Sequence, residues 1–201
     1  MAKLSKPKRK SRGAGRPVGT GNDTRAVIVN ATSALLAEMG IDGLSNRLIC
    51  ERCAVTPPTL YHHFPDKKAL LDAAVTHAFS EFIESKRRIP PASDPLDRYK
   101  EGWRNLANFA ATKPEHFKLM ASATLAKGMP KIAYALYNNV IADLNGVQEM
   151  YGLKVAVPLA AQLTMATAFG TCILPAGAPD IPWDSNLSEA ALEALLRMIL
   201  K

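Results

Sequence analysis

Apolar residues recur at three- and four-residue spacing along most of the chain, which is the period of amphipathic α-helices. The first stripe follows two candidate N-caps, Asp23 and Asn22, and Gly40 is well placed to end that helix. Its clearest members are Ile28, Ala31, Thr32, Leu35 and Leu36. No segment alternates between apolar and polar residues as a half-buried strand does. The pattern therefore predicts an all-α protein.

Two short helices joined by a tight turn are predicted after the first. They cover about 45–52, with Ser45 as the N-cap, and 56–63. Such a pair is typical of a helix-turn-helix, in which the second helix enters the major groove of DNA. The segment 56–63 is therefore the predicted recognition helix.

The two ends of this recognition helix carry distinctive residues. Pro57 is favourable at a first helical position, but Pro58 also lacks a backbone N–H. We therefore expect the Thr56 hydroxyl to cap the amide of Thr59 instead. Asp66 is expected to cap a long fourth helix that ends near residue 87.

Prolines at positions 90, 91 and 95 mark a joint after the fourth helix. Residues 175–182, bounded by two prolines, are predicted to be a loop. Five more helices are predicted over about 94–112, 114–125, 129–151, 155–172 and 186–200.

No run of about 18 uninterrupted apolar residues appears, so we expect no membrane span. The basic N-terminus lacks a following apolar segment, so we expect a cytoplasmic protein without a signal peptide.

The net charge of +7 is concentrated at the N-terminus. Residues 1–20 contain seven basic and no acidic side chains, so the remainder is formally neutral. Residues 1–21 lack apolar periodicity and are predicted to be a disordered tail that binds an anionic polymer such as DNA. A merely solubilising leader is the alternative. The candidate DNA-binding residues of the tail are Lys8, Arg9, Lys10, Arg12 and Arg16.

The predicted helix-turn-helix resembles a known family. The segment VTPPTLYHHFPDKKAL from Val55 to Leu70, with Gly40, Ser45 and Ile49 before it, is similar to the DNA-binding signature of the TetR family of bacterial transcriptional regulators. The resemblance covers about residues 24–72. It implies an all-helical homodimer, with a three-helix DNA-binding domain joined by a long fourth helix to a C-terminal ligand-binding and dimerisation domain, about nine helices in total.

The resemblance also implies domain bounds and DNA contacts. The bounds are 1–21 for the tail, 22–67 for the DNA-binding domain and 68–201 for the helical domain. By matching positions, the implied contacts are Asn46, Arg47, Thr56, Pro57, Pro58, Thr59, Tyr61, His63 and Lys67. His62 is included as their neighbour, although it can point away from DNA. A polar helix face without a partner is the alternative for the tyrosine and the histidines.

Two positions depart from the family pattern. Ala54 stands where the family usually has glycine, so we expect a slightly altered turn. The Pro57-Pro58 pair is unusual and is expected to change which bases are read.

Other chemistry has little support in the sequence. Cys50 and Cys53 form a C-x-x-C pair without a second pair for zinc, so we interpret them as small core residues, with redox sensing or metal binding as alternatives. His77 and His116 are isolated histidines on helices. Without a catalytic constellation or a phosphate-binding loop, we expect no enzyme activity, cofactor or metal.

The C-terminal half offers candidates for a ligand cavity and a dimer interface. Aromatic and methionine residues at helical spacing indicate either a bundle core or a cavity for an apolar or aromatic effector. The candidates are Trp103, Phe109, Phe117, Met120, Tyr134, Tyr137, Met165 and Phe169. Two apolar stripes near the C-terminus correspond to the family's dimer helices. Their members are Leu159, Leu163, Ala166, Gly170, Leu187, Ala191, Leu195 and Met198.

These observations predict a ligand-responsive repressor. The homodimer would bind a palindromic operator, with its recognition helices about 34 Å apart, and an effector would release it. The alternative is an architectural or low-specificity DNA-binding protein driven by the basic tail. That alternative predicts little sequence preference and loss of most binding when the tail is deleted.

Overall fold

The computed structural model describes residues 21–88 and 92–201, and within these ranges the regular structure is helical. An isolated antiparallel bridge between Leu153 and Leu200 is the only extended pairing in the described ranges. The helices are α1 (Gly21–Gly43), α2 (Asn46–Cys53), α3 (Pro57–His63), α4 (Lys67–Arg87), α5 (Pro95–Thr112), α6 (Pro114–Lys127), α7 (Lys131–Met150), α8 (Val157–Gly177) and α9 (Leu187–Ile199). The predicted all-α fold, with an N-terminal helix-turn-helix and a helical C-terminal domain, is confirmed.

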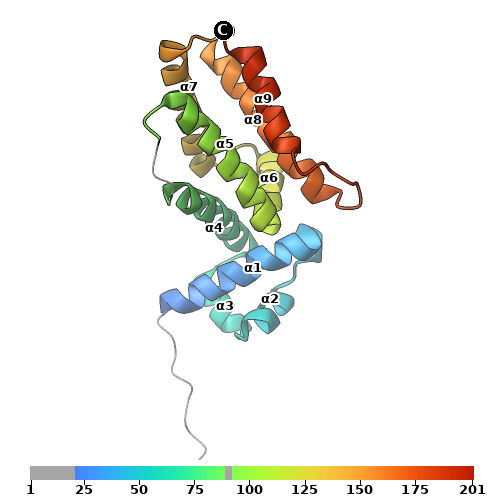
Figure 1. The fold of residues 1–201 in the computed structure, drawn as a ribbon. Helices are drawn as coiled ribbons and strands as arrows, with labels where there is room; N and C mark the ends of the chain where they lie inside the picture. The colour runs from blue at the N-terminus through green and yellow to red at the C-terminus, as the bar shows by residue number, and fades with distance from the viewer. Residues whose placement is uncertain (1–20, 89–91) are drawn as a thin grey trace, which may run out of the picture.

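Helix α4 lies between two groups of helices. Figure 1 shows α1, α2 and α3 together at one end of the molecule and α5 to α9 at the other. The first turns of α4 supply Leu70 and Ala74 to the core under α1–α3. Its later turns supply Phe79 and Phe82 to a second core shared with α5, α6, α7 and α8. A rotation or tilt of α4 therefore affects both ends.

Local capping explains where the short helices begin. The Ser45 Oγ accepts a 3.2 Å hydrogen bond from the Leu48 N–H, and the Asp66 Oδ1 accepts one of 2.7 Å from the Ala69 N–H. Both predicted caps are confirmed. The predicted cap at Thr56 is wrong, because its hydroxyl pairs with the Thr59 hydroxyl at 2.9 Å and caps no amide.

Glycine and proline act differently at two helix ends. Gly40 has φ +71° and ψ −178°, which interrupts α1 where the sequence predicts its end, and a short helical stretch then reaches Gly43. The predicted loop from residue 175 is wrong at its start, since α8 continues through Pro175 to Gly177. Pro175 has no N–H to donate to the carbonyl four residues earlier, so the last turn of α8 lacks one helical hydrogen bond and the helix ends two residues later.

A third core lies at the end furthest from α3. Its central members come from α5, α7, α8 and α9 and include Tyr99, Trp103, Leu144, Ala160, Ala161, Leu192, Leu195 and Ile199. Alanines on α8 allow neighbouring helices to approach closely. This core fixes α8 and α9 side by side (Figure 1).

Candidate nucleic-acid interface and ligand cavity

The exposed side of α3 carries most of the predicted DNA contacts. Leu60 is 2% exposed and Phe64 is 3% exposed, so these two residues anchor the helix in the core. The side chains on the other side point outward. Thr56, Pro57, Pro58, Tyr61 and His62 are exposed, and Thr59 and His63 are partly exposed. Helix α3 therefore presents a continuous polar surface of hydroxyl, phenol and imidazole groups.

Asn46 and Tyr61 join the two helices of the turn at this surface. The Asn46 Nδ2 donates a 2.9 Å hydrogen bond to the Tyr61 hydroxyl oxygen. The phenol O–H keeps its proton available for another acceptor, because it acts only as acceptor here. Tyr61 remains 52% exposed, so this pair holds an outward-facing donor in a fixed position.

Two basic residues that the sequence assigns to DNA already have partners within the chain. The Arg47 Nε lies 2.9 Å from the Glu51 carboxylate, and both side chains are largely exposed. The Lys67 Nζ donates a 2.9 Å hydrogen bond to the Leu44 carbonyl oxygen. Exposed ion pairs contribute little, so Arg47 is free to exchange its partner for a phosphate. Lys67 instead helps to fix the loop between α1 and α2.

Arg25 is a residue of this surface that the sequence reasoning missed. It lies on α1, far from the helix-turn-helix in sequence. Its guanidinium lies over the Phe64 ring, 4.9 Å from the centroid, at the C-terminal end of α3. The side chain is otherwise exposed. Only the packing of α1 against α3 reveals it, because no spacing rule links the two positions.

The turn between α2 and α3 is built on Ala54. This residue has φ +54° and ψ +38°, the left-handed conformation that glycine adopts without strain. The Ala54 N–H still reaches the Glu51 carbonyl at 3.3 Å, and the Val55 N–H reaches the Cys50 carbonyl at 3.0 Å. The turn therefore keeps its hydrogen bonds at the cost of an alanine in a strained conformation.

The cysteines before this turn are free thiols. Cys50 is buried, and Cys53 is partly exposed, with its Sγ 3.9 Å from the Val27 carbonyl. Burial raises the pKa of Cys53, and the neighbouring Cys50 adds to this effect. A raised pKa disfavours the reactive thiolate. These observations agree with the interpretation of the pair as core residues.

The predicted tail contacts at positions 8–16 lie outside the described residues.

A cavity of about 320 Å³ lies among helices α4 to α8. Four of the eight predicted pocket residues line it: Trp103, Met120, Met165 and Phe169. The lining also includes Phe79, Phe82, Leu106, Leu136 and Val140, which the sequence reasoning missed. Most of the surface that a ligand would meet is thus aromatic or aliphatic.

The other four predicted pocket residues do not line this cavity. Phe109 and Phe117 are 3% and 0% exposed, and they pack in the core beside it. Tyr134 is 54% exposed, and Tyr137 packs against the far core. For the two tyrosines the reason is the orientation of α7 about its axis, which turns Ala133, Leu136 and Val140 inward and Tyr134 outward.

Polar groups gather at one end of the cavity. Lys86, Gly102 and Asp143 line both this cavity and an adjoining solvent-open depression. The Asp143 carboxylate lies 3.4 Å from Arg98. The space beside Gly102 is open, since an added Cβ would meet only the Lys86 Nζ at 3.8 Å. This end is the natural entrance, and Lys86 places a cation there.

Inside the cavity wall, the polar groups are paired within the chain. The Tyr99 hydroxyl lies 2.8 Å from the Thr164 hydroxyl, which also donates to the Ala160 carbonyl at 2.7 Å. Burial raises the pKa of Tyr99 to about 12, with the Thr164 bond opposing. The phenol is therefore neutral at any physiological pH.

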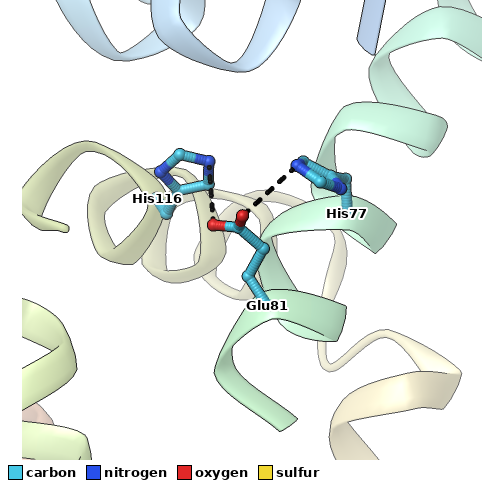
Figure 2. A group of neighbouring side chains, drawn as sticks. All are labelled: His77, Glu81 and His116. Atoms are coloured by element: carbon cyan, nitrogen blue, oxygen red, sulfur yellow. Dashed lines mark ion pairs between the residues drawn. The ribbon is translucent and has the colours of Figure 1, made fainter. Parts of the chain in front are cut away.

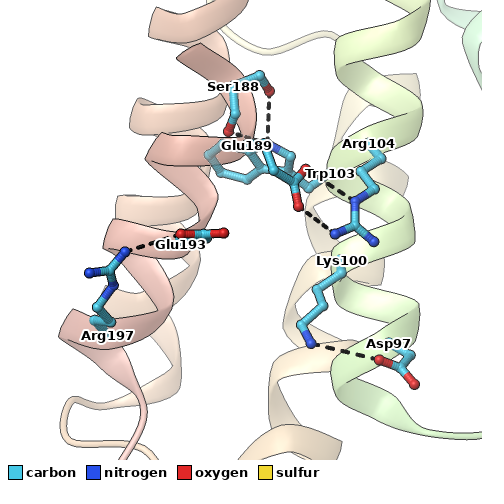
Figure 3. A network of polar contacts seen from close by, with 8 residues as sticks. All are labelled: Asp97, Lys100, Trp103, Arg104, Ser188, Glu189, Glu193 and Arg197. Carbon is cyan, nitrogen blue, oxygen red and sulfur yellow. Dashed lines mark hydrogen bonds and ion pairs between the residues drawn. The ribbon is translucent and has the colours of Figure 1, made fainter. Parts of the chain in front are cut away.

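Trp103 connects the cavity wall to α9. Figure 3 shows the indole between α5 and α9, with its Nε1 donating to the carbonyl and hydroxyl oxygens of Ser188 at 3.1 and 2.9 Å. Beside it, the Arg104 guanidinium pairs with the Glu189 carboxylate. A change in the position of Trp103 would therefore be transmitted to the N-terminal turn of α9.

The predicted dimer residues differ in their exposure. Leu159 is 46% exposed, Ala166 is exposed, and Leu163 and Gly170 are partly exposed, so α8 presents an apolar stripe to solvent. On α9, Met198 is 48% exposed and Leu187 and Ala191 are partly buried. Leu195 is only 3% exposed and is occupied in the core of its own chain, so it is not available to a partner. Ala190 and Ala194 face outward in its place.

Helix α8 is also long and apolar enough to cross a membrane, by length and composition alone. It is the one such helix in residues 21–88 and 92–201. This is weak evidence for a membrane span, because a helix packed in the core of a soluble protein passes the same test.

His77, Glu81 and His116 form a cluster that the sequence reasoning did not foresee (Figure 2). The two histidines are 39 positions apart, and packing of α6 against α4 brings their ring centroids to 6.0 Å. The Glu81 carboxylate lies between them.

A family model described as "Bacterial regulatory proteins, tetR family" matches residues 28–74. The chain is 44% identical over 52 residues to the transcriptional regulator UidR of Escherichia coli K12, a match that covers 26% of each protein. It is 40% identical over 67 residues to the class A tetracycline repressor from transposon 1721 of Escherichia coli, covering 33% of this chain and 30% of the repressor.

Residues 28–74 therefore match the DNA-binding region of the TetR family of bacterial regulatory proteins. These matches span only a quarter to a third of the curated relatives. Over the whole TetR fold the similarity is structural. The crystal structure of the multidrug binding protein EbrR in complex with imidazole superimposes with a TM-score of 0.63 at 25% identity, covering 88% of this chain and 90% of EbrR.

Proposed function

We propose that this protein is a ligand-responsive transcriptional repressor that binds a palindromic operator as a homodimer and leaves it when a small apolar or aromatic effector binds. The observation that carries the proposal is the combination of a TetR-type helix-turn-helix with an apolar cavity, connected by α4. Binding rather than catalysis is the activity at both ends, and the site of action is the bacterial cytoplasm.

DNA reading is assigned to the outward side of α3. Thr56, Thr59 and Tyr61 contact phosphates and base edges, with Asn46 holding the phenol in position. His62 and His63 donate to phosphate oxygens. Pro57 and Pro58 meet the apolar edges of bases at the start of the helix. Arg47 and Arg25 lie beside this surface and add phosphate contacts, and the Lys67 ammonium, which donates one N–H to the Leu44 carbonyl, has two further N–H groups for a phosphate.

Dimerisation is assigned to the apolar stripe of α8 with the outward side of α9. Contacts from Leu159, Leu163, Ala166 and Gly170 suit a four-helix interface, because small residues let helices approach closely. On α9 the interface uses Leu187, Ala191, Met198 and the neighbouring exposed alanines. A two-fold axis matches a palindrome with half-sites one helical turn, about 34 Å, apart.

The effector is assigned to the cavity of α4 to α8. Its aromatic and aliphatic lining suits an apolar or aromatic body, and Lys86 at the entrance suits an anionic group on that ligand. EbrR, which has the same fold, is described as a multidrug binding protein. Binding here acts on Phe79 and Phe82 of α4 and on Trp103 of α5, and so reaches both α3 and α9.

Operator binding is the experiment that tests this proposal. Selection from random duplexes should return a palindrome, and fluorescence anisotropy then measures the affinity of the full chain. Tyr61→Ala should weaken binding about 10-fold or more, because it removes a positioned donor. Tyr134→Ala is the matched control, since Tyr134 is equally exposed but lies on α7. Equal affinity for the selected site in Tyr61→Ala and wild type, or failure to select a site, contradicts the proposal.

A further inference from the structure

Three side chains able to bind a metal converge between α4 and α6. His77 and Glu81 lie one turn apart on α4, and His116 comes from the first turns of α6 (Figure 2). The His77 Nε2 lies 3.8 Å from Glu81 Oε1, and the His116 Nε2 lies 3.5 Å from Glu81 Oε2. One ligand atom from each residue fits within 4.8 Å of the others.

These distances are close to those of a tetrahedral zinc site. Zinc binds imidazole nitrogen and carboxylate oxygen at about 2.0–2.2 Å, so two ligand atoms of one ion lie about 3.4 Å apart. Both observed separations exceed that value by less than about 0.5 Å. The two separations end on different oxygens of the Glu81 carboxylate, so binding one ion requires side-chain rotations that bring one oxygen and both imidazole nitrogens to it.

Burial and neighbouring charges shift the pKa of two of the three side chains. Burial lowers the pKa of His116, and Lys113 and His77 add to this effect while Glu81 opposes it. Burial alone would raise the pKa of Glu81, but Lys113 and the two histidines outweigh it and lower that pKa.

Lys113 is the group that a cation would have to displace. Its Nζ lies 2.6 Å from Glu81 Oε2 and neutralises the carboxylate. The Lys113 side chain is 45% exposed, so its ammonium group can return to water at little cost. The three ligand side chains are 23–30% exposed, which leaves a path for the metal and room for a water ligand.

We propose that His77, Glu81 and His116 form a binding site for a divalent transition metal, with zinc the best fit, that joins α4 to α6 and leaves the fourth position to water. Two imidazoles and one carboxylate are borderline ligands that favour zinc over magnesium or calcium. The site is separate from the apolar cavity and does not depend on the proposed DNA binding.

The experiment is a metal titration of the full chain after treatment with a chelator. Isothermal titration with zinc should give one site per chain, and cobalt, used as a spectroscopic probe, should give the visible bands of tetrahedral coordination. His116→Ala and Glu81→Gln should each weaken zinc binding by about 100-fold or more, since even outer-shell partners cost about 10- to 100-fold. Glu84→Gln is the matched control, because Glu84 lies on the same helix but pairs with Arg87. It should bind zinc as the wild type does.

Lys113→Ala distinguishes a metal site from a structural ion-pair cluster. Removing the competing ammonium should raise the zinc affinity, whereas a purely structural cluster would only lose stability. Absence of saturable zinc binding overturns the proposal. So does unchanged affinity in a folded His116→Ala variant, which would place the metal elsewhere, for example at the exposed His62–His63 pair. If His116→Ala does not fold, Glu81→Gln and Lys113→Ala, with their opposite expected effects, still decide the question.

Discussion

The DNA-reading end and the cavity end of this molecule use their side chains in opposite ways. At the first end, the functional residues are polar, exposed and nearly contiguous, from Thr56 to His63 on one short helix. At the other end the proposed ligand-binding residues are apolar, buried or partly buried, and drawn from five helices, α4 to α8. The proposed DNA-binding residues form a local motif in one short segment of the sequence. The residues that line the cavity come together only when the helices pack.

The comparisons with other proteins follow the same division. The family model matches residues 28–74, and identities of 40–44% extend over only 52 and 67 residues, whereas the match to EbrR covers 88% of the chain at 25% identity. Many combinations of apolar side chains fill a helical domain equally well. The cavity end can therefore vary to accept different ligands while the DNA-reading end is retained.

The largest expected effect concerns the salt dependence at the DNA-reading end. Residues 21–88 contain equal numbers of basic and acidic side chains, so the excess positive charge lies in residues 1–20. Deleting residues 1–20 should lower the slope of log affinity against log salt concentration by roughly 6 per chain if each tail charge meets a phosphate. Anisotropy titrations between 50 and 200 mM salt measure the slope.

The operator preference should survive that deletion, because α3 and not the tail chooses the site. An unchanged slope would mean that the tail does not contact DNA. Loss of the preference together with the affinity would support the architectural alternative.

A second effect tests the buried polar pair at the cavity end. The pKa of Tyr99 is about 12, against about 10 in an unfolded chain. Between these pH values the unfolded chain gives up the phenol proton and the folded chain keeps it. The free energy of unfolding therefore falls as pH rises through this window, by about 2.3 kcal/mol at pH 12.

Urea unfolding at a series of pH values measures this contribution. Tyr99→Phe should lose it, and should also cost about 1 kcal/mol at neutral pH through the lost hydrogen bond to Thr164. Tyr134→Phe, at an exposed position, is the control and should keep the wild-type profile. The same high-pH decline in Tyr99→Phe and wild type would show that Tyr99 is not the group responsible.

A smaller effect concerns the turn at the DNA-reading end. Ala54 has a positive φ, so Ala54→Gly should relieve strain and raise the free energy of unfolding by about 1 kcal/mol. Thermal unfolding followed by circular dichroism measures the change. The reverse change at the kink of α1, Gly40→Ala, should destabilise by a similar or larger amount, because φ +71° with ψ −178° is nearly restricted to glycine. A destabilised Ala54→Gly variant would mean that the alanine methyl group makes a contact that outweighs the strain.

The sequence predicts the DNA-reading end more completely than the cavity end, for physical reasons. Ser45 and Asp66 each accept a hydrogen bond from the amide three residues later, so both N-caps can be predicted from the sequence. The prediction that Thr56 caps the amide of Thr59 is wrong, because the two threonine hydroxyls bond each other instead. Arg25 escapes prediction because it reaches α3 only through folding.

At the cavity end, helical spacing shows that a residue faces inward but not which neighbour it meets. Trp103, Met120, Met165 and Phe169 line the cavity, but the rotation of α7 turns Tyr134 to solvent. Helical spacing likewise shows that Leu195 faces inward, but not that it packs in the core of its own chain. The contact between His77 and His116 depends on how α6 packs against α4, which no local pattern encodes.

The central claim is that α3 selects the operator while the cavity controls its release. The most direct test is anisotropy on the selected palindrome with and without compounds that raise the melting temperature in a screen of small apolar and aromatic molecules. We compare the wild type with Gly102→Leu, which extends a side chain beside Lys86 into the entrance at an open position on α5. We predict that the compound weakens operator binding of the wild type by about 5- to 150-fold, while Gly102→Leu binds the operator normally and does not respond. Equal responses in the two proteins, or compounds that bind without changing operator affinity, would contradict the account.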